Sequence, residues 1–555
     1  FSILGVLAQP EVIIHNAEIY SLRTAAYEPP EEAMAISFGR ILELGSSEFL
    51  LRKYPTFASF NALGQTIVPG FIDSHAHPPE LEYNRVRLWG AKSVEECVEI
   101  IREFIVENQI SPGSWVQGRG WDHLAFPGQR WPTKEDLDVM FPAHFIAMTR
   151  FDAHVRWVNS AALAQATIPD NPPFGGFIMR DENGEPTGIF VDNAAGIIPA
   201  PPLSLSELKT AYRDVVKRLQ TVGLTTLVIA ALSPDRDAIL IKELIDEDDF
   251  DMRVYGMLPA MVPNIDLAML ERFCTGPNPE PQIHDYGDGR LTIRSVKGIL
   301  DGEIGSFGAL MLQNYIPPFE LSPGNRGLLR LPYDQYVNVS RAWAECGYQV
   351  NTHAIGDHAI RLVLDSYQSM ILANPELQSL RHRIEHADVV NAADISRFAQ
   401  LGVIPSLQPY HFPYKLRYCQ DVIGPEASAN AFLARTFYDQ NVPVAFGSDL
   451  PYLDESPLLG IHAAVSRQHE DGTPLGGYNP SERITVWEAV RGYTWSAAFA
   501  AHEELKIGSL ETGKKADFVV LDRNIIEFGD ILPELILETS VTATFMDGKL
   551  VYLAK

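Results

Sequence analysis

Cysteine is scarce in this sequence. The 555 residues include only four cysteines, which are widely spaced and form no C-x-x-C pair: Cys97, Cys274, Cys346 and Cys419. This spacing argues against a structural zinc knuckle and against a disulfide framework. Long apolar runs are missing as well. No stretch reaches about 18 apolar residues, so the sequence predicts no helix that spans a membrane.

Positive charge is also limited. Lys and Arg number 44 against 71 Asp and Glu, which leaves a net charge of −27. A chain this acidic repels phosphate backbones, so we expect no nucleic-acid partner. Glycine and proline, at 40 and 39 residues, are near ordinary usage and give no sign of bulk disorder. Hydrophobic residues make up 46 % of the chain, which is enough for a large core and more than one domain.

The first ten residues, FSILGVLAQP, bear on the cellular location. They are apolar and end in small residues, as the end of a signal peptide does. A sequon at Asn338-Val339-Ser340 adds little, because such tripeptides arise often by chance. The sequence therefore leaves both a secreted and a cytoplasmic protein open.

Strand patterns occupy both ends of the chain. Residues 11–68 read as short strands separated by turns, and residues 505–555 read the same way. β-Branched and aromatic residues alternate there with polar ones, and Asp547-Gly548 is a strong hairpin motif. Two strand-rich ends around a long middle predict one small β-sandwich domain built from both termini.

Short apolar strands alternate with helical stretches in the middle, residues 69–504. We expect eight strands, at 66–77, 225–230, 253–259, 292–302, 348–356, 381–388, 403–409 and 442–450. A strand-then-helix unit repeated in this way predicts an α/β fold of the (β/α)8 barrel type. The interval after the first strand is too long for one helix, so an insertion is predicted at about 80–203.

Metal-ligand residue types stand at the ends of these strands, where the loops of such a barrel open. They are His75 and His77 on the first strand, Lys297 on the fourth, His353 on the fifth, His386 on the sixth and Asp449 on the eighth. Residues two apart on a strand face the same way, so His75 and His77 can both point into the barrel mouth. Imidazole ligands suit Zn, Fe, Mn or Ni.

Lys297 is the unusual member of this set, because an ammonium group would be repelled by a divalent cation. It can act as a deprotonated base, or CO2 can carboxylate it to a carbamate that bridges two metals. A salt bridge to Asp301 or Glu303 is the simpler alternative. Within the whole set we prefer the carbamate.

These motifs resemble the amidohydrolase superfamily, and within it the branch called amidohydrolase family 3, which includes N-substituted formamide deformylase. The shared motifs are VPGFIDSHAH (68–77), GRGWDH (118–123), RFDAHVRWVNSAAL (150–163), GIFVDNA (188–194), VKGILDGEIGSFGA (296–309), NTHAIGDHAI (351–360), RIEHAD (383–388), FGSDLP (446–451) and IGSLETGKKADFVVLD (507–522). The resemblance extends from about residue 11 to 552.

The resemblance implies an enzyme with one or two metals, zinc first, that hydrolyses an amide-type C–N bond in a small molecule such as an N-acyl or N-formyl amine. Asp449 and His386 are the expected catalytic residues, with Asp449 as general base and then acid. Two departures stand out: Ala153 lies where the branch commonly has Gly, and Phe307-Gly308 where it commonly has Arg-Thr. Phe307 thus replaces a cation near the expected pocket, which counts against an anionic substrate group there.

Several side chains of the insertion and the strand loops are expected to line the substrate pocket or brace it. They are Trp121, Asp122, His123, Arg150, Asp152, His154, Phe307, Gln408, Tyr410 and His411. An Arg150–Asp152 pair or an Asn159 helix cap would explain those residue types without a substrate. The tryptophans of the insertion suit an aromatic substrate group or the insertion's own core, and we prefer the core.

Other functions remain open at this point. A single-metal deaminase or cyclic-amide hydrolase is disfavoured, because Gly356 stands three residues after His353 where such deaminases usually have Glu. A decarboxylase or retro-aldolase needs only carbonyl polarisation and a base. An inactive binding relative is the alternative of another class, and the complete ligand set argues against it. A homodimer is common in the superfamily, and nothing in the sequence decides the oligomeric state.

Overall fold

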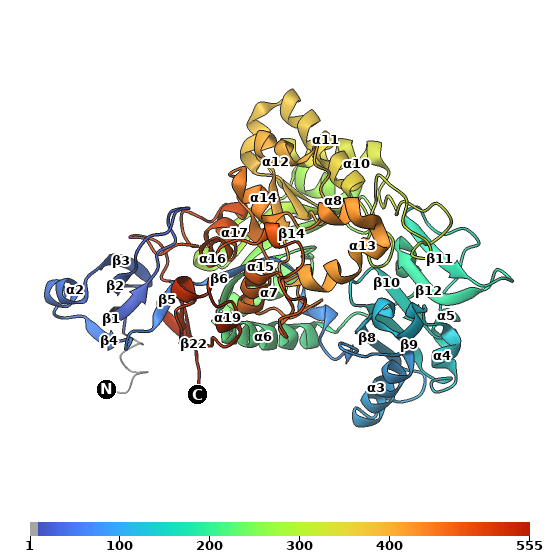
Figure 1. Ribbon diagram of the computed structural model, residues 1–555, viewed down its shortest axis with the longest axis horizontal. Helices are drawn as coiled ribbons and strands as arrows, with labels where there is room; N and C mark the ends of the chain where they lie inside the picture. The colour runs from blue at the N-terminus through green and yellow to red at the C-terminus, as the bar shows by residue number, and fades with distance from the viewer. Residues whose placement is uncertain (1–8) are drawn as a thin grey trace.

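The structure is a computed structural model that describes residues 9–555 (Figure 1). Most of the apolar stretch FSILGVLAQP lies outside the described residues. Figure 1 shows three parts side by side: a small β lobe that carries both chain ends, a central barrel, and a second β lobe on the opposite side of the barrel. None of the helices in residues 9–555 has the length and apolar character that a bilayer crossing needs.

Eight parallel strands form the barrel, in the order β6-β13-β14-β16-β17-β18-β19-β20. Their bounds are β6 Phe71–Ala76, β13 Leu224–Ile229, β14 Arg253–Met261, β16 Leu291–Ile299, β17 Gln349–Ala354, β18 Arg383–His386, β19 Ile404–Leu407 and β20 Ala445–Phe446. A parallel bridge between Ala76 and Leu450 brings the chain after β20 beside β6, so the barrel is nearly closed. The predicted α/β barrel is confirmed, and each expected strand range overlaps one of these strands.

Helices follow most of the barrel strands. The main ones are α6 Leu205–Thr221, α7 Asp237–Asp246, α10 Tyr333–Glu345, α11 Asp357–Ala373, α12 Ile395–Leu401, α13 His411–Ala429, α14 Ala434–Asp439, α15 Pro457–Ser466, α16 Val486–Gly492 and α17 Trp495–Ala500. Helix α6 shows why such segments are helical. Ser204 and Glu207 form a capping box at its start, and Leu208, Val215 and Leu219 share one buried face.

Both ends of the chain contribute strands to one eight-stranded sheet, in the order β23-β22-β21-β5-β1-β2-β3 with β4 beside β1. The bounds are β1 Glu11–Ile19, β2 Glu31–Ser37, β3 Arg40–Gly45, β4 Ala58–Asn61, β5 Thr66–Pro69, β21 Phe518–Leu521, β22 Val541–Met546 and β23 Lys549–Leu553. Antiparallel pairing of β5 with β21 joins the two ends. The turn between β22 and β23 falls at Asp547-Gly548, as the hairpin motif predicts.

A six-stranded sheet lies in the chain between β6 and α6, in the order β11-β12-β10-β9-β8-β7. The bounds are β7 Val86–Arg87, β8 Trp115–Trp121, β9 Phe145–Arg150, β10 Val155–Val158, β11 Gly176–Arg180 and β12 Pro186–Asp192, with α3 Val94–Glu107, α4 Lys134–Asp138 and α5 Ser160–Leu163 packed nearby. Trp121 and Trp157 are fully buried in the core of this lobe. These two tryptophans therefore serve the insertion's own packing.

One cysteine pair corrects the expectation from the sequence. Cys274 and Cys346 form a disulfide with their Cα atoms 5.7 Å apart, although 72 residues separate them in the chain. Cys274 lies in a short helical segment after β14, and Cys346 caps the end of α10. Their meeting depends on how neighbouring barrel units pack, which cysteine spacing does not reveal.

Candidate metal centre

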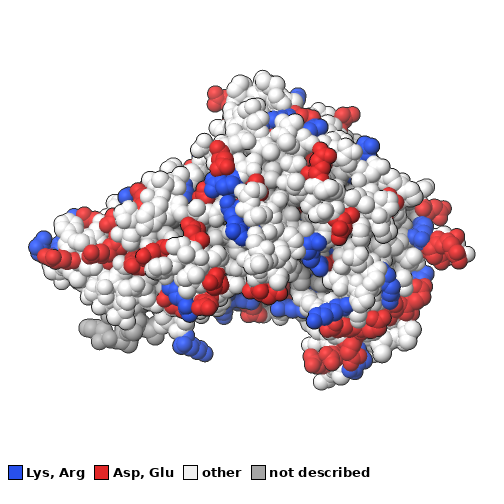
Figure 2. Space-filling model, viewed as in Figure 1, with Lys and Arg blue, Asp and Glu red and all other residues white. Residues whose placement is uncertain are grey.

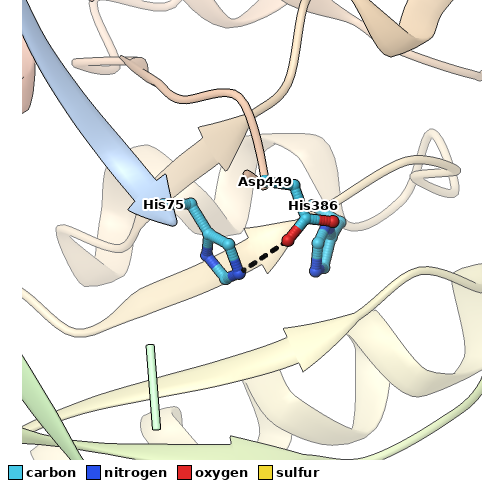
Figure 3. A group of neighbouring side chains, drawn as sticks. All are labelled: His75, His386 and Asp449. Atoms are coloured by element: carbon cyan, nitrogen blue, oxygen red, sulfur yellow. Dashed lines mark ion pairs between the residues drawn. The ribbon is translucent and has the colours of Figure 1, made fainter. Parts of the chain in front are cut away.

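Three candidate ligands meet at the mouth of the barrel. His75 is the penultimate residue of β6, His386 ends β18, and Asp449 lies in the loop after β20 (Figure 3). One ligand atom from each residue lies within 4.8 Å of the others, and all three side chains are buried. Figure 3 shows the imidazole of His75 and the carboxylate of Asp449 turned toward one another, with His386 beside them.

The other three candidates surround this cluster. His77 Nε2 lies 3.1 Å from Asp449 Oδ1. Lys297 Nζ lies 3.3 Å from His75 Nε2. The ring of His353 stacks edge-on against His386, with centroids 4.4 Å apart, while its Nε2 faces the carbonyl oxygen of Gly302 at 3.4 Å. All six candidates thus lie at one site, with His75, His386 and Asp449 at its centre.

Hydrogen bonds behind the histidines set their tautomers. Nδ1 of His75 bonds to the carboxylate of Glu385, and Nδ1 of His386 lies 2.7 Å from Oε1 of Gln408. A carboxylate or amide oxygen only accepts, so each Nδ1 carries the proton and each Nε2 keeps its lone pair. Burial lowers the pKa of His75 to about 4 and that of His386 well below its usual value. Both imidazoles are therefore neutral at pH 7.

The resulting donor set fits a metal ion. His75 Nε2, which holds a lone pair, faces Asp449 Oδ1 at 3.5 Å. Burial raises the pKa of Asp449, but the bond from His77 and the neighbouring imidazoles outweigh it, so that pKa stays well below its usual value. Two lone-pair atoms at this spacing in a buried site are arranged as two ligands of one cation would be. Nitrogen and carboxylate ligands of this kind suit zinc and related ions.

The backbone holds the first and last strands of the barrel together at this point. The carboxylate of Asp73 accepts bonds from the backbone N–H of His75 and of Ser448, both at 3.0 Å. Asp449 N also donates to His75 O at 2.7 Å. His386 and Asp449 adopt left-handed φ angles of 73° and 60°, which are unusual for residues with a Cβ. The site thus fixes both side chains through an unfavourable backbone conformation.

Lys297 is buried, and it forms no ion pair with any residue in the range 9–555. Asp301 and Glu303, the salt-bridge partners that the sequence offered for Lys297, interact with other groups instead. Asp301 accepts three backbone N–H groups, from Leu310, Ile355 and Gly356, and Glu303 pairs with Lys415 at 2.8 Å. Burial lowers the pKa of Lys297 to about 8. An unpaired buried lysine is suited to losing its proton or becoming carboxylated.

A cavity of about 260 Å³, called here the central cavity, opens above the cluster. Its lining includes Asp152, His154, Arg330, His411, Lys415 and Tyr452. His154 Nδ1 bonds to Asp192 at 2.6 Å, and its ring lies 5.2 Å from that of His353. His411 Nε2 bonds to the carbonyl oxygen of Ser448 at 3.0 Å, which leaves Nδ1 as an acceptor. Polar side chains of both signs therefore surround any molecule bound here.

The structure places three of the ten expected pocket residues in this lining: Asp152, His154 and His411. Phe307 lies elsewhere, because the loop after β16 turns it into a buried group with His123, Trp131 and Tyr315. The missing cation at this position therefore does not bear on the substrate.

The remaining expected residues lie outside this lining, and most of them support the site from behind. Arg150 is fully buried and pairs with both Asp122 and Asp152, so the pairing considered from the sequence is present. Asn159 caps α5, as also considered. Trp121 and His123 pack in the insertion, Gln408 orients His386, and Tyr410 bonds to Glu470 at the surface.

Several site residues were not predicted from the sequence. Glu385 bonds to His75, and Arg330, Lys415 and Tyr452 line the central cavity. Glu385 could have been found, because it is a carboxylate inside RIEH, directly before a strand-end histidine. Arg330 comes from a loop and Lys415 from a helix, where no strand periodicity indicates which way a side chain points.

Comparisons with known proteins agree with this geometry. A family model described as the amidohydrolase family matches residues 59–552. The chain belongs to this family. It is 30 % identical to Protein LONG AFTER FAR-RED 3 of Arabidopsis thaliana, over 99 % of this chain and 92 % of that protein. It is 27 % identical to N-substituted formamide deformylase of Arthrobacter pascens, over 98 % of each chain.

A solved structure shares the whole architecture. The crystal structure of an uncharacterized metal-dependent hydrolase from Pyrococcus furiosus superposes with a TM-score of 0.68 at 27 % identity, over 93 % of this chain and 100 % of that one. Family and architecture together identify a metal-dependent hydrolase of the amidohydrolase superfamily. The site at the barrel mouth is where such a protein would hold its metal.

Proposed function

We propose that this protein hydrolyses an amide-type C–N bond in a small molecule of the N-acyl or N-formyl amine class. The buried cluster of His75, His386 and Asp449 beneath the central cavity is the observation that carries the proposal. Similarity along nearly the whole chain to a protein named N-substituted formamide deformylase supports this class of bond.

His75, His386 and Asp449 would hold a divalent ion, zinc first, with His77, Lys297 and His353 available around them. When bound, the ion would supply a Lewis acid and make water nucleophilic at neutral pH. Glu385 and Gln408 keep the two imidazoles in the tautomers whose Nε2 atoms can bind it.

Asp449 is the residue placed to move the proton. Its carboxylate remains ionised, it faces the cavity, and His77 Nε2 orients it from 3.1 Å away. Asp449 takes a proton from the attacking water and passes it to the nitrogen of the leaving amine. One carboxylate serves both steps, because the proton that Asp449 takes from water is the proton that it gives to the amine nitrogen. His386 would stay beside Asp449 as a metal ligand during both steps.

We also propose that Lys297 carries a carbamate. At a pKa of about 8, about one lysine in ten is an uncharged amine at pH 7, against about one in three thousand for a free side chain. Its Nζ already lies 3.3 Å from His75 Nε2, where two carbamate oxygens could join the ligand set. Native mass spectrometry should show an added mass equal to one CO2, which the Lys297→Met variant loses. An unmodified lysine in the metal-loaded protein would refute the carbamate but not hydrolysis.

The function is tested by screening N-acyl and N-formyl amines with the metal-loaded protein and measuring released amine. At least one member of these classes should be hydrolysed, and Asp449→Asn should abolish the reaction. A protein that holds its full complement of metal and releases no amine from any member would contradict the proposal.

We further propose that the protein works in an oxidising compartment. The Cys274–Cys346 disulfide supports the secreted alternative, because such bonds rarely persist in a reducing cytosol. Thiol alkylation of intact cells should leave both cysteines unmodified until a reductant is added. Full alkylation without reductant would favour the cytoplasmic alternative.

A further inference from the structure

A second cavity borders the central one. It has a volume of about 220 Å³, and it shares Ala153 and Tyr452 with the lining of the central cavity. Its floor is the six-stranded sheet of the insertion, which contributes Gln117 and Ala147 among others. We call it the arginine cavity, because Arg85, Arg119 and Arg156 line it.

Strand register explains how the arginines come together. Thr149 on β9 lies directly opposite Arg119 on β8 and opposite Arg156 on β10. Residues in register across neighbouring strands point to the same face of a sheet. Arg119 and Arg156 therefore flank Thr149 on the face that meets the cavity, and Arg85 lines the same space from the segment before β7.

The lining of the arginine cavity itself carries little negative charge. Among the described residues, Glu80 is the one carboxylate in the lining, and it is already engaged by Arg236 and by the backbone N–H of Leu203. Arg85 makes no hydrogen bond or ion pair with any residue that the structure describes, and Arg156 makes one, from Nη1 to the carbonyl oxygen of Ile198 at 2.9 Å. Burial and the charge of Arg85 lower the pKa of Arg156.

The surroundings make this concentration of positive charge unusual. The whole chain has a net charge of −27, and Figure 2 shows acidic side chains gathered over the insertion on the face in view. Arg119 is buried, and Arg85 and Arg156 are half-buried. Like charges that are partly shielded from water repel one another, and an anion between them lowers that cost. The cavity is therefore built to receive a negative group.

We propose that the arginine cavity binds a carboxylate. The planar fork of a guanidinium matches the two oxygens of a carboxylate, and about 220 Å³ suits a small acid or the acidic end of a larger molecule. The ring of Tyr452 forms the common wall, 4.4 Å from the guanidinium of Arg119 on one side and 5.2 Å from the ring of His77 on the other.

The cavity also connects outward. It shares Arg85 and Arg119 with an outer cavity of about 610 Å³. Because amide hydrolysis releases a carboxylic acid, the bound carboxylate is either the acid product on its way out or an acidic group of the substrate. This assignment of a source rests on the proposed function, whereas the binding of a carboxylate does not.

Binding is tested without turnover, by titrating acetate into the chelator-treated full-length protein in a low-chloride buffer and following the heat. Acetate should bind saturably, and Arg85→Gln and Arg156→Gln should each weaken binding by about tenfold or more, the effect of losing one charge-assisted hydrogen bond. Arg102→Gln is the matched control, since Arg102 lies on α3 of the same lobe and pairs with Glu99 at the surface. It should change the affinity by less than about twofold.

Three results would overturn the proposal: no saturable binding to wild-type protein, equal binding by all variants, or binding that His386→Ala abolishes while Arg85→Gln leaves it unchanged. The last result would assign acetate to the barrel-mouth site. Arg85→Gln is the safer variant, because Arg85 has no bonded partner among the described residues and its removal leaves none unsatisfied. Arginine-dependent binding with no amide hydrolysis would sustain the cavity and contradict the proposed function instead.

Kinetics then separate the two sources. If the substrate supplies the carboxylate, Arg156→Gln raises KM for N-acyl amino acids and leaves neutral amides unchanged. If the product supplies it, the same variant raises the inhibition constant of acetate and leaves kcat/KM for neutral amides unchanged. The Arg156→Gln variant could instead hydrolyse both substrate types normally and show the same acetate inhibition as the wild-type protein. That result would show that the arginine cavity has no part in the reaction.

Discussion

Replacing Glu385 by Gln tests how the barrel holds its first metal ligand. Glu385 is fully buried, and its carboxylate accepts a hydrogen bond from Nδ1–H of His75. It also accepts two bonds from Arg383, from Nε at 2.7 Å and from Nη2 at 2.8 Å. Burial alone would raise the pKa of Glu385, but the charge of Arg383 and the bond from His75 lower it. The substitution keeps the shape of the side chain and removes its charge.

Two effects should follow, and their sizes can be bounded. Arg383 loses its buried partner, and breaking a buried ion pair costs about 3–5 kcal/mol of folding free energy. His75 loses the acceptor that fixes its tautomer, and a lost partner of this kind weakens metal binding by about 10–100-fold, or about 1.4–2.7 kcal/mol. The metal-free variant should therefore unfold at lower urea, and the folded variant should bind zinc less tightly.

Urea denaturation of metal-free protein and zinc competition with a chelator measure the two effects separately. Glu504→Gln is the matched control, because Glu504 pairs with Arg381 and is partly exposed away from the site. It should lower stability by at most about 1 kcal/mol and leave zinc affinity unchanged. Normal zinc affinity in a folded Glu385→Gln variant would refute the assignment of Glu385 as the residue that positions His75.

Three further predictions concern separate parts of the molecule. Asp449→Asn should lower turnover by several orders of magnitude while the fold survives, and near-normal turnover would remove Asp449 from the base role. Gly447→Ala should weaken metal binding and stability, because a Cβ there would lie 2.5 Å from the backbone N of His75, whereas Gly196→Ala has open space and should change neither. Cys346→Ser should cost about 4 kcal/mol by the chain-entropy model, because the disulfide closes a 72-residue loop, and an unchanged urea midpoint would contradict this.

The barrel and its mouth could be predicted from the sequence because both follow from local patterns. Apolar strands alternate with amphipathic helices, and parallel strands in such a fold present their carboxyl ends to one opening. His75, His353 and His386 are the last or second-last residues of their strands, so the fold alone brings them together. The hairpin at Asp547-Gly548 could be predicted for a similar reason, since two residues determine the turn type.

What could not be predicted depends on contacts between distant segments. Phe307 sits in a long loop whose path places it against His123 of the insertion, about 184 residues away in the chain, and not in the cavity. Lys415 reaches the central cavity from a helix. Arg119 comes beside Thr149 only once the register between β8 and β9 is fixed, and sequence patterns do not give register between strands that a long segment separates.

Elemental analysis of the purified full-length protein tests the central claim most directly. The geometry of His75, His386 and Asp449 predicts at least about one divalent metal per chain, lost in the His386→Ala variant and restored to stripped wild-type protein by added zinc. Less than about 0.5 metal per chain, with no gain on adding Zn, Mn or bicarbonate, would contradict a metal-dependent hydrolase at this site.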